Sequence, residues 1–157
     1  MKKVILSGVV FMSVLISCKK EIEMEEPATA SEKIIVTEPE SQECYRAIFK
    51  KDTISLTLNK KNGQISSGNL SYNFYEKDKN EGPLIGEMKA DTLYADYTFM
   101  SEGTSSVREV AFLKKGDSYI EGFGDVVDDN KGKVIFKDKK QLKFDGNVVL
   151  SKVDCKM

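Results

Sequence analysis

Short runs in which apolar and polar residues alternate follow one another through the chain from residue 44 onward. In the first of them Ile54, Leu56 and Leu58 are separated by polar residues, which places the three apolar side chains on one face of an extended strand. Asn62-Gly63 follows, and this dipeptide favours the tight turn of a β-hairpin because both central residues need a positive φ. The pattern predicts an antiparallel all-β fold.

Turn residues recur at similar intervals to the end of the chain and predict nine or ten short strands, most of them joined to their sequence neighbours. Gly68 is expected to mark a bulge or a sharp bend, and residues 78–83 are expected to form a polar loop. A capping box leaves a helix over residues 106–115 as the less favoured alternative to a strand there. Further strands are expected at residues 84–89, 93–99, 107–113 and 119–127, and the inward-facing candidates beyond them are Val134, Phe136, Leu142, Phe144, Val148 and Leu150.

Residues 44–157 supply enough chain for one hydrophobic core and not for two, so we expect a single β domain over this range. Consecutive antiparallel strands form an up-and-down meander, which buries its apolar face by curling up. The expected architecture is therefore a small, lipocalin-like barrel or a flattened sandwich.

The first eighteen residues have the composition of an export signal. Lys2 and Lys3 form a basic start, an apolar run covers residues 4–16, and Ser17 precedes Cys18. The run is shorter than the roughly 20 residues of a transmembrane helix, and a cysteine after a small residue is typical of the site where bacterial lipoproteins are lipidated. We expect a signal peptide over residues 1–17 and an acylated Cys18 that anchors the protein to a membrane. Plain secretion without lipid is the alternative.

Residues 18–43 are expected to form a flexible acidic tether between the lipid and the domain. The segment is rich in glutamate and contains two prolines, so it buries too little apolar surface to offset the entropy of ordering. Removal of Lys2 and Lys3 lowers the 24 basic residues to 22, against 25 acidic ones, and this balance gives no positive field for nucleic acid. The expected location is the bacterial cell envelope, with the protein anchored to the outer membrane and either periplasmic or surface-exposed.

Two further cysteines, Cys44 and Cys155, stand at the two ends of the predicted domain. An exported compartment permits disulfides, and the first and last strands of a closed meander are neighbours. We therefore expect a structural disulfide between Cys44 and Cys155 across the closing seam. A redox or metal pair is less favoured because the two cysteines are far apart in the sequence and the chain has no histidine.

The lack of histidine also removes the usual general base and a common metal ligand. Asp125, Asp128, Asp129 and Asn130 form the densest acidic cluster, but the alternating ligand spacing of a calcium loop is missing. A solvated turn is favoured there over a weak calcium site. We expect no metal and no cofactor.

Arg108 is one of two arginines in a chain that otherwise uses lysine. If residues 107–113 form a strand, Arg108 shares a face with Val110 and Phe112 and points inward. A buried guanidinium needs a partner, and its planar fork suits carboxylates. The two interpretations are a structural salt bridge to Glu102 or Glu109 and a site for the carboxylate or phosphate of a ligand.

Tyr72 and Tyr97 are the aromatic candidates for the lining of such a ligand cavity, although aromatic residues at a spacing of two are commonly core residues. Arg108, Tyr72 and Tyr97 together are the candidate ligand-binding residues. No catalytic residue stands out, because a domain of this size contains many carboxylate pairs and spacing selects none of them.

Several stretches resemble small lipoproteins of the Bacteroidota, particularly flavobacterial ones. They are Asp91 to Gly103, Ser106 to Phe112, Glu76 to Asn80 and Val153 to Lys156, and the signal with Cys18 is similar as well. The resemblance implies an envelope lipoprotein with a β domain and assigns no functional residue.

These observations predict a non-enzymatic binding module at the envelope, which holds a small apolar ligand or a partner protein. The alternative is a carboxylate-dependent hydrolase that acts on envelope glycans. A dry apolar cavity would favour the binding module, and a deep polar cleft with two carboxylates would favour the hydrolase.

Overall fold

The computed structural model describes residues 40–101 and 103–155. The predicted signal peptide (residues 1–17), Cys18 and the tether as far as residue 39 lie outside these residues. The first strand begins at Ser41, within the range assigned to the tether. The elements are β1 (Ser41–Phe49), β2 (Asp52–Lys61), β3 (Gln64–Asn73), β4 (Asn80–Lys89), β5 (Thr92–Ser101), β6 (Thr104–Lys115), β7 (Ser118–Glu121), β8 (Val126–Asp128), β9 (Lys133–Phe136), the 3-10 helix η1 (Lys139–Gln141) and β10 (Val149–Val153).

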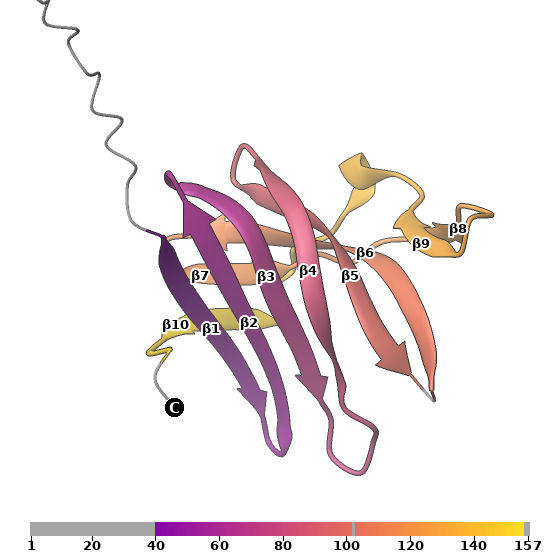
Figure 1. The fold of residues 1–157 in the computed structure, drawn as a ribbon, viewed down its shortest axis with the longest axis horizontal. Coiled ribbons are helices and arrows are strands. Elements are labelled where there is room, and N and C mark those ends of the chain that lie inside the picture. Colours follow the sequence, from indigo (N-terminus) through magenta and orange to yellow (C-terminus); the bar gives the residue numbers. More distant parts are fainter. Residues whose placement is uncertain (1–39, 102, 156–157) are drawn as a thin grey trace, which may run out of the picture. The chain divides into compact units, whose positions relative to one another are not determined.

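The strands form a closed barrel. From β1 to β7 each strand pairs antiparallel with the next. β7 then pairs with β10, and β10 pairs with β1. These eight strands form the wall, with β1 to β5 in front of β7 and β10 in the view of Figure 1. The predicted all-β, up-and-down barrel is confirmed, and the range 106–115 is strand β6 and not a helix.

The hairpin predicted at Asn62-Gly63 is present, with φ of 52° and 73° at the two residues. The predicted irregularity lies elsewhere than expected, because the register of β2 and β3 shifts between Asn59 and Lys60, where Ser66 is the extra residue. Gly68 itself pairs with Leu58 in regular register. Because Gly68 has no side chain, the neighbouring strand can approach its backbone closely: a Cβ there would lie 2.6 Å from the carbonyl oxygen of Thr57.

The polar loop predicted at residues 78–83 is shorter than expected, because β4 begins at Asn80. Gly82 lies so close to β5 that an added Cβ would overlap the carbonyl oxygen of Thr98. Pro83 pairs with Asn69 of β3, and the ladder to β5 begins only at Leu84. Proline is tolerated at such a position because one side of the strand is not in a ladder there.

The predicted strand over residues 119–127 is wrong: β7 ends at Glu121 and β8 begins at Val126. Between them Gly122 and Gly124 are covered by Phe144 and Leu142, whose side chains occupy the space of a Cβ. The chain therefore leaves the wall at residue 122 and returns as β10. In between, β8 pairs with β9, and β9 pairs in parallel with the first part of β6. In Figure 1 this excursion stands to one side of the barrel.

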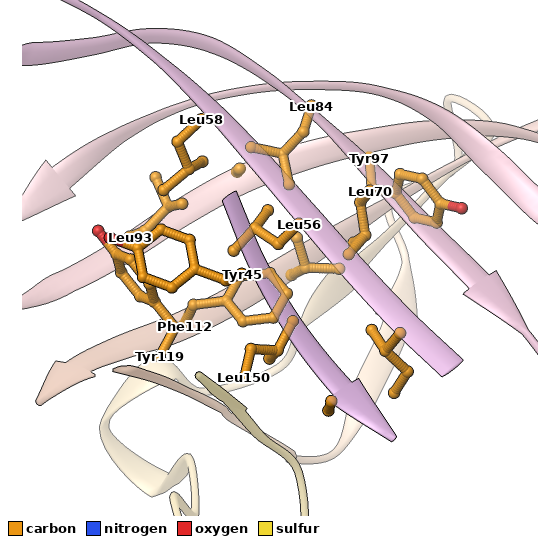
Figure 2. Close-up of a cluster of buried hydrophobic side chains, with 14 of the residues drawn as sticks. Tyr45, Leu56, Leu58, Leu70, Leu84, Leu93, Tyr97, Phe112, Tyr119 and Leu150 are labelled. Atoms are coloured by element: carbon orange, nitrogen blue, oxygen red, sulfur yellow. The ribbon is translucent and has the colours of Figure 1, made fainter. Parts of the chain in front are cut away.

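Inward side chains of the eight wall strands fill most of the barrel. The largest fully buried ones form one core cluster, and Figure 2 shows them gathered between the strands: Tyr45, Leu56, Leu58, Leu70, Leu84, Leu93, Tyr97, Phe112, Tyr119 and Leu150. Each buried leucine contributes roughly 1.5–3 kcal/mol relative to an exposed one. Of the inward candidates in the last part of the chain, Leu150 is confirmed, Val134 is exposed, and Phe136, Leu142, Phe144 and Val148 are half-buried.

The predicted disulfide between Cys44 and Cys155 is confirmed, with the two Cα atoms 5.2 Å apart. Cys44 lies on β1 opposite Val153 of β10. The bond therefore joins the first and last strands of the barrel beside the seam where they pair.

Charged side chains close the barrel at this end, where β1 begins and β2 and β10 finish. The half-buried carboxylate of Glu43 lies 2.7 Å from Lys60 Nζ and 3.2 Å from Lys152 Nζ, and it accepts a 2.8 Å hydrogen bond from Tyr45 Oη. Burial alone would raise the pKa of Glu43, but these hydrogen bonds lower it to about 2. We call this group the Glu43 cluster.

Candidate ligand-binding site

A cavity of about 480 Å³ opens at the opposite end of the barrel, where β1, β3 and β7 finish and β2, β6 and β10 begin. This volume lies within the range of small-molecule sites. The lining is mainly apolar, and three of its aromatic or aliphatic members, Phe49, Phe123 and Val126, are exposed at the opening. The remaining apolar lining consists of Ile54, Phe74, Val110, Phe136 and Val148.

Arg108 lines this cavity from β6. As predicted, it shares the inward face with Val110 and Phe112, and it pairs across the ladder with Tyr97 of β5. Its guanidinium carbon lies 5.0 Å from the ring centre of Tyr72 and 5.6 Å from that of Tyr97. Phe99 adds a third ring at 5.6 Å. Ring faces attract the positive charge, so these aromatic residues hold the guanidinium inside the barrel.

Two neighbouring polar atoms lack partners. Arg108 Nε and Tyr97 Oη are both buried, and the described residues provide a hydrogen-bond partner for neither. A buried polar group without a partner costs about 1–3 kcal/mol. Burial raises the pKa of Tyr97 to about 12, against the opposing effect of Arg108, so its hydroxyl stays protonated at neutral pH.

Tyr72 and Glu121 form the second polar element of the cavity. Tyr72 Oη donates a 2.5 Å hydrogen bond to a carboxylate oxygen of Glu121, and both side chains are buried. Burial raises the pKa of Glu121, while the tyrosine hydrogen bond and the charge of Arg108 act in the other direction. The pKa of Tyr72 is also raised, by burial and by Glu121. The pair thus places at the cavity wall a buried carboxyl group whose pKa lies above its ordinary value.

Glu109 lines the cavity as well, but it is engaged elsewhere. One carboxylate oxygen lies 2.6 Å from Lys139 Nζ, and the other accepts a 3.2 Å hydrogen bond from the backbone N–H of Phe136. The salt bridge considered between Arg108 and Glu109 is therefore absent. Glu102, the other partner considered for Arg108, lies outside the described residues.

The structure brings two of the three candidate residues to the cavity. Arg108 and Tyr72 line it, whereas Tyr97 is fully buried behind Arg108 and lies at one edge of the core cluster in Figure 2. Glu121 was not a candidate from the sequence. Its spacing of two from the inward Tyr119 is the signal that could have identified it, since alternate residues of a strand share a face.

In the acidic turn after β8, aspartate side chains accept hydrogen bonds from backbone N–H groups of the same turn. Asp128 accepts a hydrogen bond from the N–H of Asn130, and Asp129 accepts from those of Lys131 and Lys133. These backbone hydrogen bonds lower the pKa of Asp129. Among the described residues no group of three acidic or cysteine side chains is arranged to hold a metal ion.

The described part of the chain contains no helix with the length and apolar character needed to cross a membrane. Comparisons of the chain with protein-family models, with curated proteins and with solved structures found no match.

Proposed function

We propose that this protein is a non-enzymatic binding module that holds a small, largely apolar ligand in the cavity at the open end of the barrel. The observation that carries the proposal is the cavity itself, with about 480 Å³ of space and a mainly apolar lining. The rest of the barrel is filled by fully buried side chains. An apolar space of this size with a few convergent polar groups is the usual form of a ligand site.

We place this activity at the bacterial cell envelope, because the sequence predicts an acyl anchor at Cys18. The alternative function, a hydrolase of envelope glycans, needs two carboxylates that both face the substrate. Glu109 and Glu121 line the cavity, but Glu109 is held by Lys139 and by the backbone of Phe136. The geometry therefore supports binding better than hydrolysis. A protein partner seated on the apolar opening is the other occupant that the test below distinguishes.

The test uses the exported protein and N-phenyl-1-naphthylamine, an uncharged apolar dye that fluoresces in dry sites. We expect saturable binding with one dye per barrel. Val126→Trp should weaken binding at least tenfold, because the larger side chain occupies the opening. Val127→Trp is the matched control: both valines lie on β8 and are exposed, by 55% and 45%, but only Val126 lines the cavity.

Native mass spectrometry of the same protein checks for a ligand carried over from the cell. Extra mass of a small molecule that is lost on denaturation would support the proposal. No dye binding, or equal binding by the two tryptophan variants, would contradict it and leave a protein partner as the better occupant.

A further inference from the structure

We propose that the ligand is an amphipathic carboxylic acid, whose carboxylate accepts hydrogen bonds from Arg108 while its apolar chain lies along the cavity wall. This inference rests on the proposed function and adds the chemical class of the ligand. It starts from a guanidinium that the barrel holds at an apolar cavity without a carboxylate partner among the described residues.

The contacts of Arg108 attract its charge but leave at least one of its donors without an acceptor. Three aromatic rings lie within 5.6 Å of the guanidinium carbon, and a ring face offers no lone pair comparable to that of an oxygen. The Tyr72 hydroxyl also interacts with the guanidinium, but its proton is donated to Glu121. Arg108 Nε is buried without a partner. Among the described residues, no carboxylate lies within salt-bridge distance of Arg108. An incoming oxygen acceptor would therefore recover a hydrogen bond that the empty site lacks.

The other charges at the cavity favour an anion over a neutral or cationic head group. The carboxylate of Glu109 lies against Lys139, 2.6 Å away, so that pair is close to neutral. Glu121 accepts a hydrogen bond from the Tyr72 hydroxyl, and burial raises the pKa of Glu121, which reduces its repulsion of an anion. Arg108 is thus the one cation of the lining, and the described residues place no carboxylate within salt-bridge distance of it.

Two features narrow the anion to a carboxylate with an apolar chain. The planar fork of a guanidinium presents parallel N–H groups that match two carboxylate oxygens. A single arginine is a poor match for the several charges of a diphosphate. The cavity that Arg108 lines is mainly apolar, with Phe74, Val110 and Val148 in its wall, so it would bury a hydrocarbon chain better than a polar one.

The test compares decanoic acid with 1-decanol as competitors for the bound dye at neutral pH. We expect the acid to displace the dye at about ten- to hundredfold lower concentration, the range for a hydrogen bond to a charged group. In Arg108→Met the ratio of the displacing concentrations, 1-decanol over decanoic acid, should fall to about one, whatever the absolute affinities of the two competitors. Arg108→Lys keeps the charge without the fork and should give an intermediate ratio.

Lys51→Gln is the control for overall charge. It removes one positive charge at the same end of the barrel, where Lys51 lies over the exposed ring of Tyr75 and does not line the cavity. The ratio should remain that of the wild type. Sodium acetate, which has the head group without the chain, should not displace the dye at the concentration where decanoic acid does.

The outcomes separate this inference from the proposed function. If the dye binds and the wild type shows no preference for the acid, the inference of a carboxylate ligand is contradicted and the proposed apolar binding site is still supported. A preference for the acid that persists in Arg108→Met would contradict the role of Arg108 in recognising the carboxylate. Displacement of the dye by acetate would contradict the need for an apolar chain. If neither dye nor competitor binds, the proposed function itself fails. The wild-type comparison needs no variant, so it holds even if Arg108→Met does not fold.

Discussion

Each end of the barrel holds a glutamate that accepts a hydrogen bond from an inward tyrosine, yet the pKa of one carboxyl group is lowered and that of the other is raised. At the disulfide end, Glu43 accepts a hydrogen bond from the Tyr45 hydroxyl and also lies against Lys60 and Lys152, and its pKa is lowered to about 2. At the cavity end, Glu121 accepts a 2.5 Å hydrogen bond from the Tyr72 hydroxyl, and its pKa is raised.

The difference lies in what surrounds each pair and not in the pair itself. Ammonium groups complete the Glu43 cluster, so that its charge is compensated and the cluster closes the barrel. The described residues bring no lysine within salt-bridge distance of Glu121, and Arg108 acts on it only through its charge. A carboxylate compensated by ammonium groups is a structural element, whereas a buried carboxyl group with a raised pKa beside a cavity is typical of a functional site.

The largest effect on the disulfide end should come from its covalent bond. The double variant Cys44→Ser, Cys155→Ser removes a bridge between residues 111 positions apart, and we expect the free energy of unfolding to fall by about 3–5 kcal/mol. Urea denaturation of the oxidised proteins measures the change. A reducing agent should produce a similar loss in the wild type and none in the variant. A loss below about 1 kcal/mol would show that strand pairing alone holds the seam.

Loss of the Glu43 charge should have the next largest effect. The folded pKa of about 2 lies below the ordinary 4.5, so the stabilisation is fully present above pH 4.5 and is lost as the pH falls through 2. We expect Glu43→Gln to lower the free energy of unfolding by about 1–3 kcal/mol at neutral pH, because the cluster is partly open to water. The difference from the wild type should vanish near pH 2.

Glu40→Gln is the matched control for that variant. Glu40 pairs with Lys61 over 3.3 Å, but both side chains are more than half exposed, and such pairs contribute little. Its unfolding free energy should stay within about 0.5 kcal/mol of the wild type at every pH. Equal effects of the two substitutions would contradict a special role for the Glu43 cluster.

The smallest effect is expected at Glu121. Because its folded pKa is raised, the wild type is more stable at low pH and loses this stabilisation as the pH rises past 4.5 and through the folded pKa. Glu121→Gln keeps an acceptor for Tyr72 and carries no charge. We therefore expect its stability at neutral pH to be equal to that of the wild type or up to about 1 kcal/mol higher. Thermal unfolding at several pH values measures this, and a large loss at neutral pH would mean that the charge of Glu121 stabilises the barrel.

The barrel wall was predictable because its signal is local. Alternation around Ile54, Leu56 and Leu58 specifies a strand and its inward face without reference to the rest of the chain. The seam disulfide followed from the topology, since a closed meander brings Cys44 and Cys155 together. Arg108 was placed inward by the same alternation.

The excursion over residues 122–148 was not predictable in this way. Its path depends on distant contacts, such as Phe144 over Gly122 and Leu142 over Gly124, and a spacing of two carries no information about them. Half of the site depends on this segment, because Phe123, Val126 and Phe136 complete the cavity. The sequence therefore identified the polar group of the site but not the space beside it.

The seam disulfide also determines how the domain would respond to mechanical load. Tension applied through the chain that precedes Ser41 reaches Cys44 at the fourth residue of β1, and the covalent bond then divides it between the first strand and Cys155, just beyond the last. β1 cannot be peeled away from β10 one hydrogen bond at a time past that point. A barrel pulled from its N-terminal side is thus locked at the seam between its first and last strands, while the cavity at the other end is left outside the path of the force.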